Sequence, residues 1–377
     1  MNIQEIFSSA FGYPSQGVWS APGRANLIGE HTDYTGGFVM PFALNFRARI
    51  AAKPRNDQLV RAVTPKGTVR EIQLDHVRLG EPTGFLGYLA GAAWVLRNDH
   101  GLDHGWDLAL QSDIPIGAGL SSSAAITCAT ILAMSDLVNL GLSHEQMALA
   151  AQQVEHQVIG TPCGIMDQLA SMLGEKDRIL FIDTRDLSHE QVMWNANSHN
   201  LTILITNTNS PHVLADGQYA AKRARCEEAT EIMEVKQLRD ASLADLDQYQ
   251  ERLLPDQQSC ARHVITENAR VLRTKELLLN NKLPHIGALL TSSHESLRDD
   301  FNVTVAQVDL AVDTALSNGA LGARMIGGGF GGCTLALVRK TDVLMITERI
   351  ATAFSEHNYT APESFVAAPA AGAQRDF

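Results

Sequence analysis

The sequence predicts an α+β fold of two domains in which helices pack against mixed sheets. Its 377 residues are enough for two domains of about 150 residues or for one large one. Strand-like and helix-like segments alternate in both halves, which favours α+β layers over a helix bundle. After Tyr219, long charged helical patterns dominate. A division near residue 195 fits this change, so we expect an N-terminal domain over residues 1–195 and a C-terminal domain over residues 196–377.

The elements of the N-terminal half follow from turn residues and apolar spacing. The runs 60–63 and 68–74 flank the turn Thr-Pro-Lys-Gly and predict a hairpin. Apolar residues at helical spacing predict an amphipathic helix over roughly 83–98. Ser143, with a glutamine three residues later, resembles a capping box that opens a helix ending at Gly160. The expected apolar face of that helix consists of Met147, Ala151, Val154 and Val158.

The C-terminal half is expected to be richer in helices. Strand-like runs at 178–182 and 201–206 come before its helical patterns. Helical patterns then cover 215–235, 257–281, 285–299 and 304–317. Two more apolar runs, 324–326 and 333–338, flank a cluster of glycines. This order of elements completes the α+β prediction.

Composition and charge exclude several classes of protein. The formal charge of −12 removes the broad positive surface that nucleic-acid binders need and disfavours anionic membranes. An anionic ligand must therefore be held by backbone N–H groups or a bound metal ion. The five cysteines form no Cys-x-x-Cys pair, so neither a disulfide framework nor a structural zinc site is indicated.

The same features bear on location and assembly. No Lys or Arg precedes Arg24, which argues against a signal peptide, and the apolar stretches are too short to span a membrane. We expect a cytoplasmic protein that is a monomer or a weak homo-oligomer, with small molecules as its partners.

The segment 114–125, Ile-Pro-Ile-Gly-Ala-Gly-Leu-Ser-Ser-Ser-Ala-Ala, carries the strongest functional signal. Gly117 and Gly119 let the backbone approach an anion, and Ser121 is expected to cap the helix that follows. A glycine loop that leads into a helix N-terminus holds phosphate through free N–H groups and the positive end of the helix dipole. The alternative is a plain turn before a helix. The P-loop pattern occurs nowhere in the chain, and this segment is not Gly-x-Gly-x-x-Gly either, because Ser122 stands where the third glycine would be.

A second segment, 21–37, combines Arg24 with Glu30, His31 and Asp33. Carboxylates accept hydrogen bonds from two neighbouring hydroxyls, and imidazole donates or accepts one. This combination of groups suits the recognition of a sugar or another polyol. A solvated polar loop is the alternative.

Two further acids are candidates for a site. Asp167 lies among apolar neighbours, where an unpaired carboxylate is costly, so we expect a cation or ligand beside it. Glu155 is expected on the polar side of the helix that ends at Gly160. The alternative for each is an ordinary surface acid.

The glycine cluster within 322–333 lies between two apolar runs. Glycines in that setting favour close packing of the loop against another backbone, here the phosphate loop, and the alternative is a flexible linker. His100 and His104 have the spacing of metal ligands, but without a third ligand they predict a surface turn.

These segments together resemble a known family. The segment 114–125 resembles the phosphate loop of the GHMP small-molecule kinases. The segments Gly-Arg-Ala-Asn-Leu-Ile-Gly-Glu-His-Thr-Asp-Tyr (23–34) and Gly-Gly-Gly-Phe-Gly-Gly-Cys (327–333) are similar to galactokinase segments within that family. Further similar segments are 163–168, 262–270 and 292–301. The similarity extends from about residue 20 to about residue 340.

The resemblance implies a two-domain GHMP kinase fold with the active site in the cleft between the domains. It implies transfer of the ATP γ-phosphate to the C1 hydroxyl of α-D-galactose, which gives galactose 1-phosphate and ADP. Arg24 would stabilise the transferring phosphoryl group, and Asp167 would act on the C1 hydroxyl. Galactose would be held by Glu30, His31, Asp33 and Tyr219.

The resemblance also assigns the residues that contact ATP and the metal. The ATP phosphates would be wrapped by Gly117, Ala118, Gly119, Leu120, Ser121, Ser122 and Ser123. Ser123 and Glu155 would ligate Mg²⁺, the cofactor that this reaction uses. Two alternatives stay open: a kinase of the same fold for another sugar such as N-acetylgalactosamine, and a non-enzymatic sensor of galactose and ATP.

Overall fold

A computed structural model of the chain describes residues 2–81, 83–115, 117–210 and 215–377, and the statements below concern these residues. Ile116, part of the predicted phosphate loop, lies outside them. The strands are β1 Gly17–Asn26, β2 Phe38–Val39, β3 Pro41–Arg55, β4 Leu59–Val63, β5 Arg70–Gln73, β6 Gly105–Ser112, β7 Arg178–Asp183, β8 His189–Met193, β9 Leu201–Asn207, β10 Gly322–Ile326, β11 Cys333–Arg339, β12 Glu363–Ala367 and β13 Gln374–Arg375.

The helices alternate with these strands, as the sequence predicts. They are α1 Ile3–Phe11, α2 Phe85–His100, α3 Ser122–Leu137, α4 His144–Gln153, α5 Met166–Leu173, α6 Ala215–Ile232, α7 Leu243–Tyr249, α8 Pro255–Leu279, α9 Ile286–Asp299, α10 Ala306–Ser317 and α11 Val343–Glu356. None of these helices is long and apolar enough to cross a bilayer.

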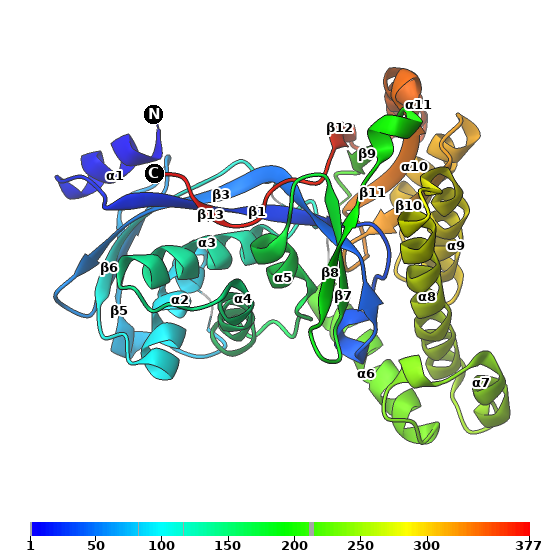
Figure 1. Cartoon of the computed structure of the whole chain (residues 1–377), viewed down its shortest axis with the longest axis horizontal. Helices are drawn as coiled ribbons and strands as arrows, with labels where there is room; N and C mark the ends of the chain where they lie inside the picture. Colours follow the sequence, from blue (N-terminus) through cyan, green and yellow to red (C-terminus); the bar gives the residue numbers. More distant parts are fainter. Residues whose placement is uncertain (1, 82, 116, 211–214) are drawn as a thin grey trace.

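The strands form three sheets, so the predicted α+β class with mixed sheets is confirmed. A six-stranded sheet has the order β13-β1-β3-β6-β4-β5, a four-stranded sheet the order β10-β11-β9-β12, and a three-stranded sheet the order β2-β7-β8. Helices α2 to α5 cover one face of the sheet that contains the long strands β1 and β3 (Figure 1). Helices α8 to α10 lie at the opposite end of the molecule from α1 (Figure 1).

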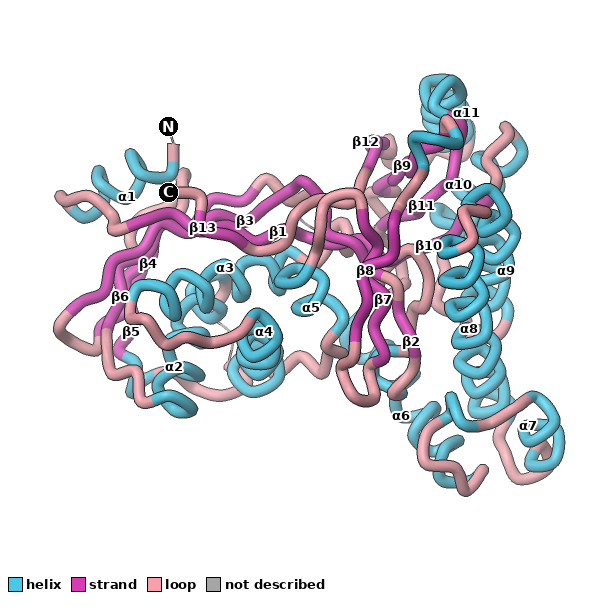
Figure 2. The backbone as a smooth tube through the Cα atoms, viewed as in Figure 1, coloured by secondary structure: helices cyan, strands magenta, loops and turns pink. Residues whose placement is uncertain are grey.

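The end of the chain returns to the N-terminal sheet. Strand β13 pairs with β1 through Trp19 and Arg375, so the last residues of the chain lie beside the first half, although the sequence predicts residues 196–377 to form the C-terminal domain. Figure 2 shows this stretch crossing back along β1 and β3. The boundary near residue 195 stays a prediction.

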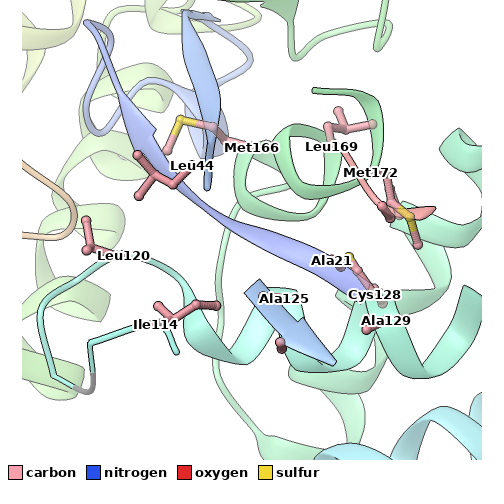
Figure 3. Packing of buried hydrophobic residues seen from close by; sticks show 14 of the residues in the cluster. Ala21, Leu44, Ile114, Leu120, Ala125, Cys128, Ala129, Met166, Leu169 and Met172 are labelled. Atoms are coloured by element: carbon pink, nitrogen blue, oxygen red, sulfur yellow. The ribbon is translucent and has the colours of Figure 1, made fainter. Parts of the chain in front are cut away.

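The core of the N-terminal half packs the long strands against α3 and α5. Ala21 of β1, Cys128 of α3 and Leu169 of α5 are all fully buried in one cluster (Figure 3). Leu120, in the loop before α3, is buried in the same cluster. Apolar packing therefore fixes the segment just before α3, whose backbone is expected to meet phosphate.

Several predicted elements are confirmed with small shifts in their ends. Strands β4 and β5 form the predicted antiparallel hairpin, and Ser143 closes a complete capping box with Gln146 at the start of α4. His100 is the last residue of α2 and His104 lies in the irregular segment before β6, so the predicted surface position of both is confirmed, although His100 is helical. The helix after α4 departs from prediction because residues Val154–Ile159 form a π-helical turn.

Candidate active site

A cleft of about 660 Å³ brings together residues from both halves of the chain. Of the residues singled out in the sequence, it is lined by Arg24, Glu30, His31, Asp33, Ser123, Glu155, Asp167 and Tyr219. The glycines Gly327, Gly328 and Gly329 complete its wall. The fold thus gathers four parts of the chain around one cleft. They are the segment 21–37, called the sugar motif below, the start of α3, the start of α5 and the glycine-rich loop within 322–333.

Arg24 and Asp167 form an ion pair at this cleft. Two parallel hydrogen bonds join them, from Nε to Oδ1 at 2.7 Å and from Nη2 to Oδ2 at 2.9 Å. The register of β1 against β3 shifts between Pro22 and Arg24, and such an irregularity re-aims a side chain. Arg24 Nη1 also donates to the carbonyl oxygen of Gly119 at 2.7 Å, so one guanidinium touches both α5 and the phosphate loop.

The phosphate loop has the backbone geometry that the glycines predict. Gly117 and Gly119 adopt φ values of +73° and +70°, which residues with a Cβ rarely adopt. The predicted capping role of Ser121 is wrong. Ser121 is itself left-handed and makes no capping hydrogen bond, because its hydroxyl donates to Asp167 instead. Helix α3 therefore begins without a Ser121 cap, which leaves its N-terminal donors for a ligand.

Ser123, in the first turn of α3, lies beside Glu155. The Ser123 hydroxyl donates to Glu155 at 3.1 Å, and the Gln168 amide donates to the other Glu155 oxygen at 2.8 Å. Burial and then the charge of Asp167 raise the pKa of Glu155 to about 7. The prediction that Glu155 is on the polar side of its helix is wrong, because it is buried within the π-helical turn that follows α4.

The donor set of Ser123 and Glu155 fits a magnesium ion. Both offer oxygen atoms, which Mg²⁺ prefers as ligands. A Mg²⁺ ion bound to a nucleotide fills most of its coordination positions with water and phosphate oxygens, so two protein ligands are enough. No group of three or more His, Cys, Asp or Glu side chains within the described ranges could hold a metal by itself. A metal at this place would therefore depend on phosphate oxygens as well as on the protein.

The sugar motif contributes three ionisable groups with altered pKa values. Burial raises the pKa of Glu30, and burial together with the charges of Asp167 and Glu30 raises the pKa of Asp33 to about 7. Burial lowers the pKa of His31 to about 3, so its imidazole is neutral. His31 Nδ1 contacts the Tyr34 hydroxyl at 2.9 Å, whereas its Nε2 atom is buried with no hydrogen-bond partner among the described residues.

The glycine-rich loop lies against the phosphate loop, as the glycine cluster predicts. A Cβ added to Gly327 would come within 3.3 Å of the Gly119 carbonyl oxygen. The Gly327 N–H donates to Glu30 at 2.9 Å. Gly328 faces the ring of Tyr219, which also lies 5.4 Å from His31 between ring centres. The loop is therefore a wall of the cleft and not a flexible linker.

Gly164 is a cleft residue that the sequence reasoning does not single out. A Cβ at this position would overlap the Asp33 carboxylate, so only glycine leaves Asp33 in its place. Only one feature of the sequence points to Gly164: it belongs to the segment 163–168, which is similar to a galactokinase segment. Tyr88 of α2 also lines the cleft and is not among the predicted site residues.

The altered pKa of Asp33 predicts a pH-dependent stability of the ligand-free protein. Because its pKa rises from 3.8 to about 7 on folding, the folded state holds more protons than the unfolded state between these values, and stability falls as pH rises through that range. We expect the melting temperature of Asp33→Asn to fall less between pH 5 and pH 8 than that of the unaltered protein. Equal losses in both proteins would contradict the assigned pKa.

Comparisons with known proteins agree with this geometry. The family model for the GHMP kinases N terminal domain matches residues 87–175, and the galactokinase galactose-binding signature matches residues 5–54. The model for the GHMP kinases C terminal region matches residues 274–356. The three matches together cover the sugar motif, the phosphate loop and the glycine-rich loop.

Relatives of known sequence and structure point the same way. A galactokinase from Streptomyces coelicolor is 43% identical over 377 residues, which covers 99% of this chain and 97% of the relative. A galactokinase from Chloroflexus aurantiacus is 43% identical over 89% of this chain and 87% of its own. The structure of Lactococcus lactis galactokinase complexed with galactose matches with a TM-score of 0.93 and 32% identity, over 99% of this chain and 98% of that one. This chain therefore belongs to the galactokinase family of the GHMP kinases.

Proposed function

We propose that this protein transfers the γ-phosphoryl group of ATP to the C1 hydroxyl of α-D-galactose and releases galactose 1-phosphate and ADP. The observation that carries the proposal is the paired Arg24 and Asp167 in the cleft, between the sugar motif and the phosphate loop. The complex of the Lactococcus lactis galactokinase with galactose supports the choice of sugar. The galactose-binding signature over residues 5–54 supports it independently.

The reaction needs positioning and charge neutralisation more than covalent chemistry. In the proposal, Arg24 neutralises charge on the moving phosphoryl group, since its guanidinium stays protonated and already touches the phosphate loop. Asp167 faces the C1 hydroxyl. Its Oδ1 accepts one hydrogen bond, from Arg24, and keeps a lone pair for that hydroxyl.

Galactose would be held by the side chains that line the cleft on the side of the sugar motif. His31 Nε2 is a buried polar atom without a hydrogen-bond partner among the described residues and would contact a hydroxyl, and Asp33, when ionised, accepts from two hydroxyls. Glu30 and Tyr219 complete the proposed sugar site. Tyr219 comes from α6 and the other three residues come from the segment 30–33, so both halves of the chain contact one ligand.

The phosphates would lie at the backbone of Gly117 to Ser123, at the N-terminal end of α3. Ser123 and Glu155 would hold the magnesium ion, which supplies positive charge to the β- and γ-phosphates when bound. Ala118 and Leu120 would act through their backbone, since their side chains are buried in the core.

Phosphorylation assays across a panel of acceptors test the proposal. The panel consists of galactose, glucose, N-acetylgalactosamine, mevalonate and homoserine, each with ATP and magnesium. We expect turnover with galactose to exceed that with every other acceptor. A preference for N-acetylgalactosamine would favour the other-sugar kinase. Binding of galactose and ATP without any turnover would favour the sensor.

Removing the negative charge of Glu155 tests the proposed metal site. We expect Glu155→Gln to raise the magnesium concentration needed for half-maximal activity and to lower turnover, because an amide is a poorer ligand for a hard cation. Galactose binding in the absence of nucleotide should stay near that of the unaltered protein. An unchanged magnesium dependence would remove Glu155 from the site.

Removing Asp33 tests the proposed sugar site. A galactose hydroxyl that loses its buried partner costs roughly 1–3 kcal/mol, so Asp33→Ala should weaken galactose binding by about tenfold or more. ATP affinity, measured by calorimetry, should barely change. A loss of ATP affinity with normal galactose affinity would show that this loop does not face the sugar.

A further inference from the structure

A row of buried polar side chains on α8 faces the sugar motif. His263, Glu267 and Asn268 recur at helical spacing and are at most 5% exposed. They belong to the segment 262–270, to which the proposed reaction gives no role. Buried polar groups of this kind need partners, and here the partners are in the first half of the chain.

The partners are backbone groups of the sugar motif and of Phe38, the residue that follows it. Glu267 Oε1 accepts from the Gly29 N–H at 2.9 Å, and Asn268 Oδ1 accepts from the Phe38 N–H at 2.8 Å. His263 Nε2 lies 3.1 Å from the carbonyl oxygen of Glu30. Helix α8 therefore contacts the backbone of residues 29–38 at three places.

Glu267 is the most strongly held member of this row. Besides Gly29, it accepts from the Ser293 hydroxyl at 2.7 Å and from Arg270 Nε at 2.6 Å. Burial alone would raise the pKa of Glu267, but the charges of Arg270 and Arg324 hold it at about 2. Glu267 is therefore a fixed negative charge in the interior.

Arg324 of β10 lies between Glu267 and Glu30. Its side chain is fully buried, with Nη1 at 3.6 Å from Glu30 Oε1 and Nη2 at 3.9 Å from Glu267 Oε1. Nη1 also donates to the carbonyl oxygens of Asn26 and Leu27, at 3.3 and 3.2 Å. One buried cation thus contacts the turn that carries Glu30 and compensates two buried carboxylates.

Each oxygen of the Glu30 carboxylate accepts one hydrogen bond from the protein. Its Oε1 accepts from the Gly327 N–H at 2.9 Å and its Oε2 from the Asn26 amide at 3.0 Å. Without the charge of Arg324, this nearly buried carboxylate would lose a neighbouring cation that offsets its desolvation. It would then take up a proton or turn away, and either change alters what it offers to a sugar.

We propose that Arg324 and Glu267 are positioning residues, which hold Glu30 in the orientation that binds galactose and join the sugar motif to the glycine-rich loop. The proposal rests on the proposed function, since it deepens the account of the same sugar site. Neither residue lines the cleft, so both act through Glu30 and the turn 26–31.

A double-mutant cycle between Arg324 and Glu30 tests this proposal. The variants are Arg324→Met, Glu30→Gln and the double variant, with the KM for galactose, the KM for ATP and the galactose dissociation constant measured for each. We expect Arg324→Met to raise the galactose KM by about tenfold or more and the ATP KM by less than about threefold. In the Glu30→Gln background the same change should raise the galactose KM by less than about threefold, because the two residues act as one unit.

Three further variants sharpen the test. Arg324→Lys keeps the charge and should recover part of the galactose affinity lost in Arg324→Met. Glu267→Gln removes the charge and replaces one acceptor oxygen with an amide donor, and it serves in the same cycle if Arg324→Met does not fold. Arg339→Met, on the neighbouring strand β11, removes an exposed arginine that pairs with Asp342 and should leave both KM values unchanged.

The possible results separate the inference from the proposed function. Equal increases in galactose KM with and without Glu30, or equal increases in the KM values for galactose and ATP, would show that Arg324 has only a structural role and would overturn the inference. Galactose binding by the unaltered protein without phosphorylation would contradict the proposed function alone, and the cycle would then be read from the dissociation constants. Absence of both binding and turnover would contradict both.

Discussion

Arg24→Ala is expected to lower turnover by about 10²–10³-fold or more. The guanidinium contacts both Asp167 and the phosphate loop, and loss of one preorganised group that stabilises transition-state charge has an effect of this size. Measurement of kcat with saturating galactose and ATP checks the prediction. Galactose affinity should change far less than kcat.

Two variants control for indirect effects. Arg24→Lys keeps the charge but loses the two parallel hydrogen bonds to Asp167, so its activity should fall between that of the unaltered protein and Arg24→Ala. Arg49→Ala, on the adjacent strand β3, breaks a more exposed ion pair with Asp113 and should leave kcat unchanged. Near-normal kcat in Arg24→Ala would exclude Arg24 from the reaction.

Asp167→Asn is expected to lower turnover by about 10²–10⁴-fold while galactose still binds. Asparagine keeps the shape of the side chain but cannot take a proton from the C1 hydroxyl. It also places an amide opposite Arg24 and Ser121, where the structure has a carboxylate that accepts from both. Turnover and galactose affinity should be measured for Asp167→Asn and Asp167→Ala in parallel.

The comparison between these two variants separates the roles open to Asp167. A base loses its function in both, so their turnover should be similarly low. A group that only orients the hydroxyl and balances charge leaves far more activity in Asp167→Asn than in Asp167→Ala. The surface control Asp113→Asn should be fully active. Near-normal turnover in Asp167→Ala would remove both roles from the mechanism.

Local sequence patterns predict much of the fold. The hairpin of β4 and β5 and the capping box at Ser143 depend on residues a few positions apart, so the sequence shows them directly. The approach of Gly327 to Gly119 is also predicted, because glycines between two apolar strands favour close contact with another backbone. The long helices α8 and α9 follow from their 3.6-residue periodicity.

The failures arise where the decisive partner is distant in the sequence or the helical geometry changes. Ser121 does not cap α3 because Asp167, 46 positions away, takes its hydroxyl. Glu155 is buried because a π-helical turn changes the face on which it lies, and a 3.6-residue period cannot show this. Glu267 looks like an ordinary acid of a charged helix, although its partners Gly29 and Arg324 make it a buried anchor.

The identity of the phosphorylated product tests the central claim most directly. The protein is incubated with ATP, magnesium and galactose, and the product is examined by phosphorus NMR. The account predicts one sugar phosphate with its phosphoryl group on C1 in the α configuration, formed in step with ADP, because Asp167 is proposed to act on the C1 hydroxyl. A phosphoryl group at any other carbon, or the appearance of free phosphate in place of a sugar phosphate, would contradict it.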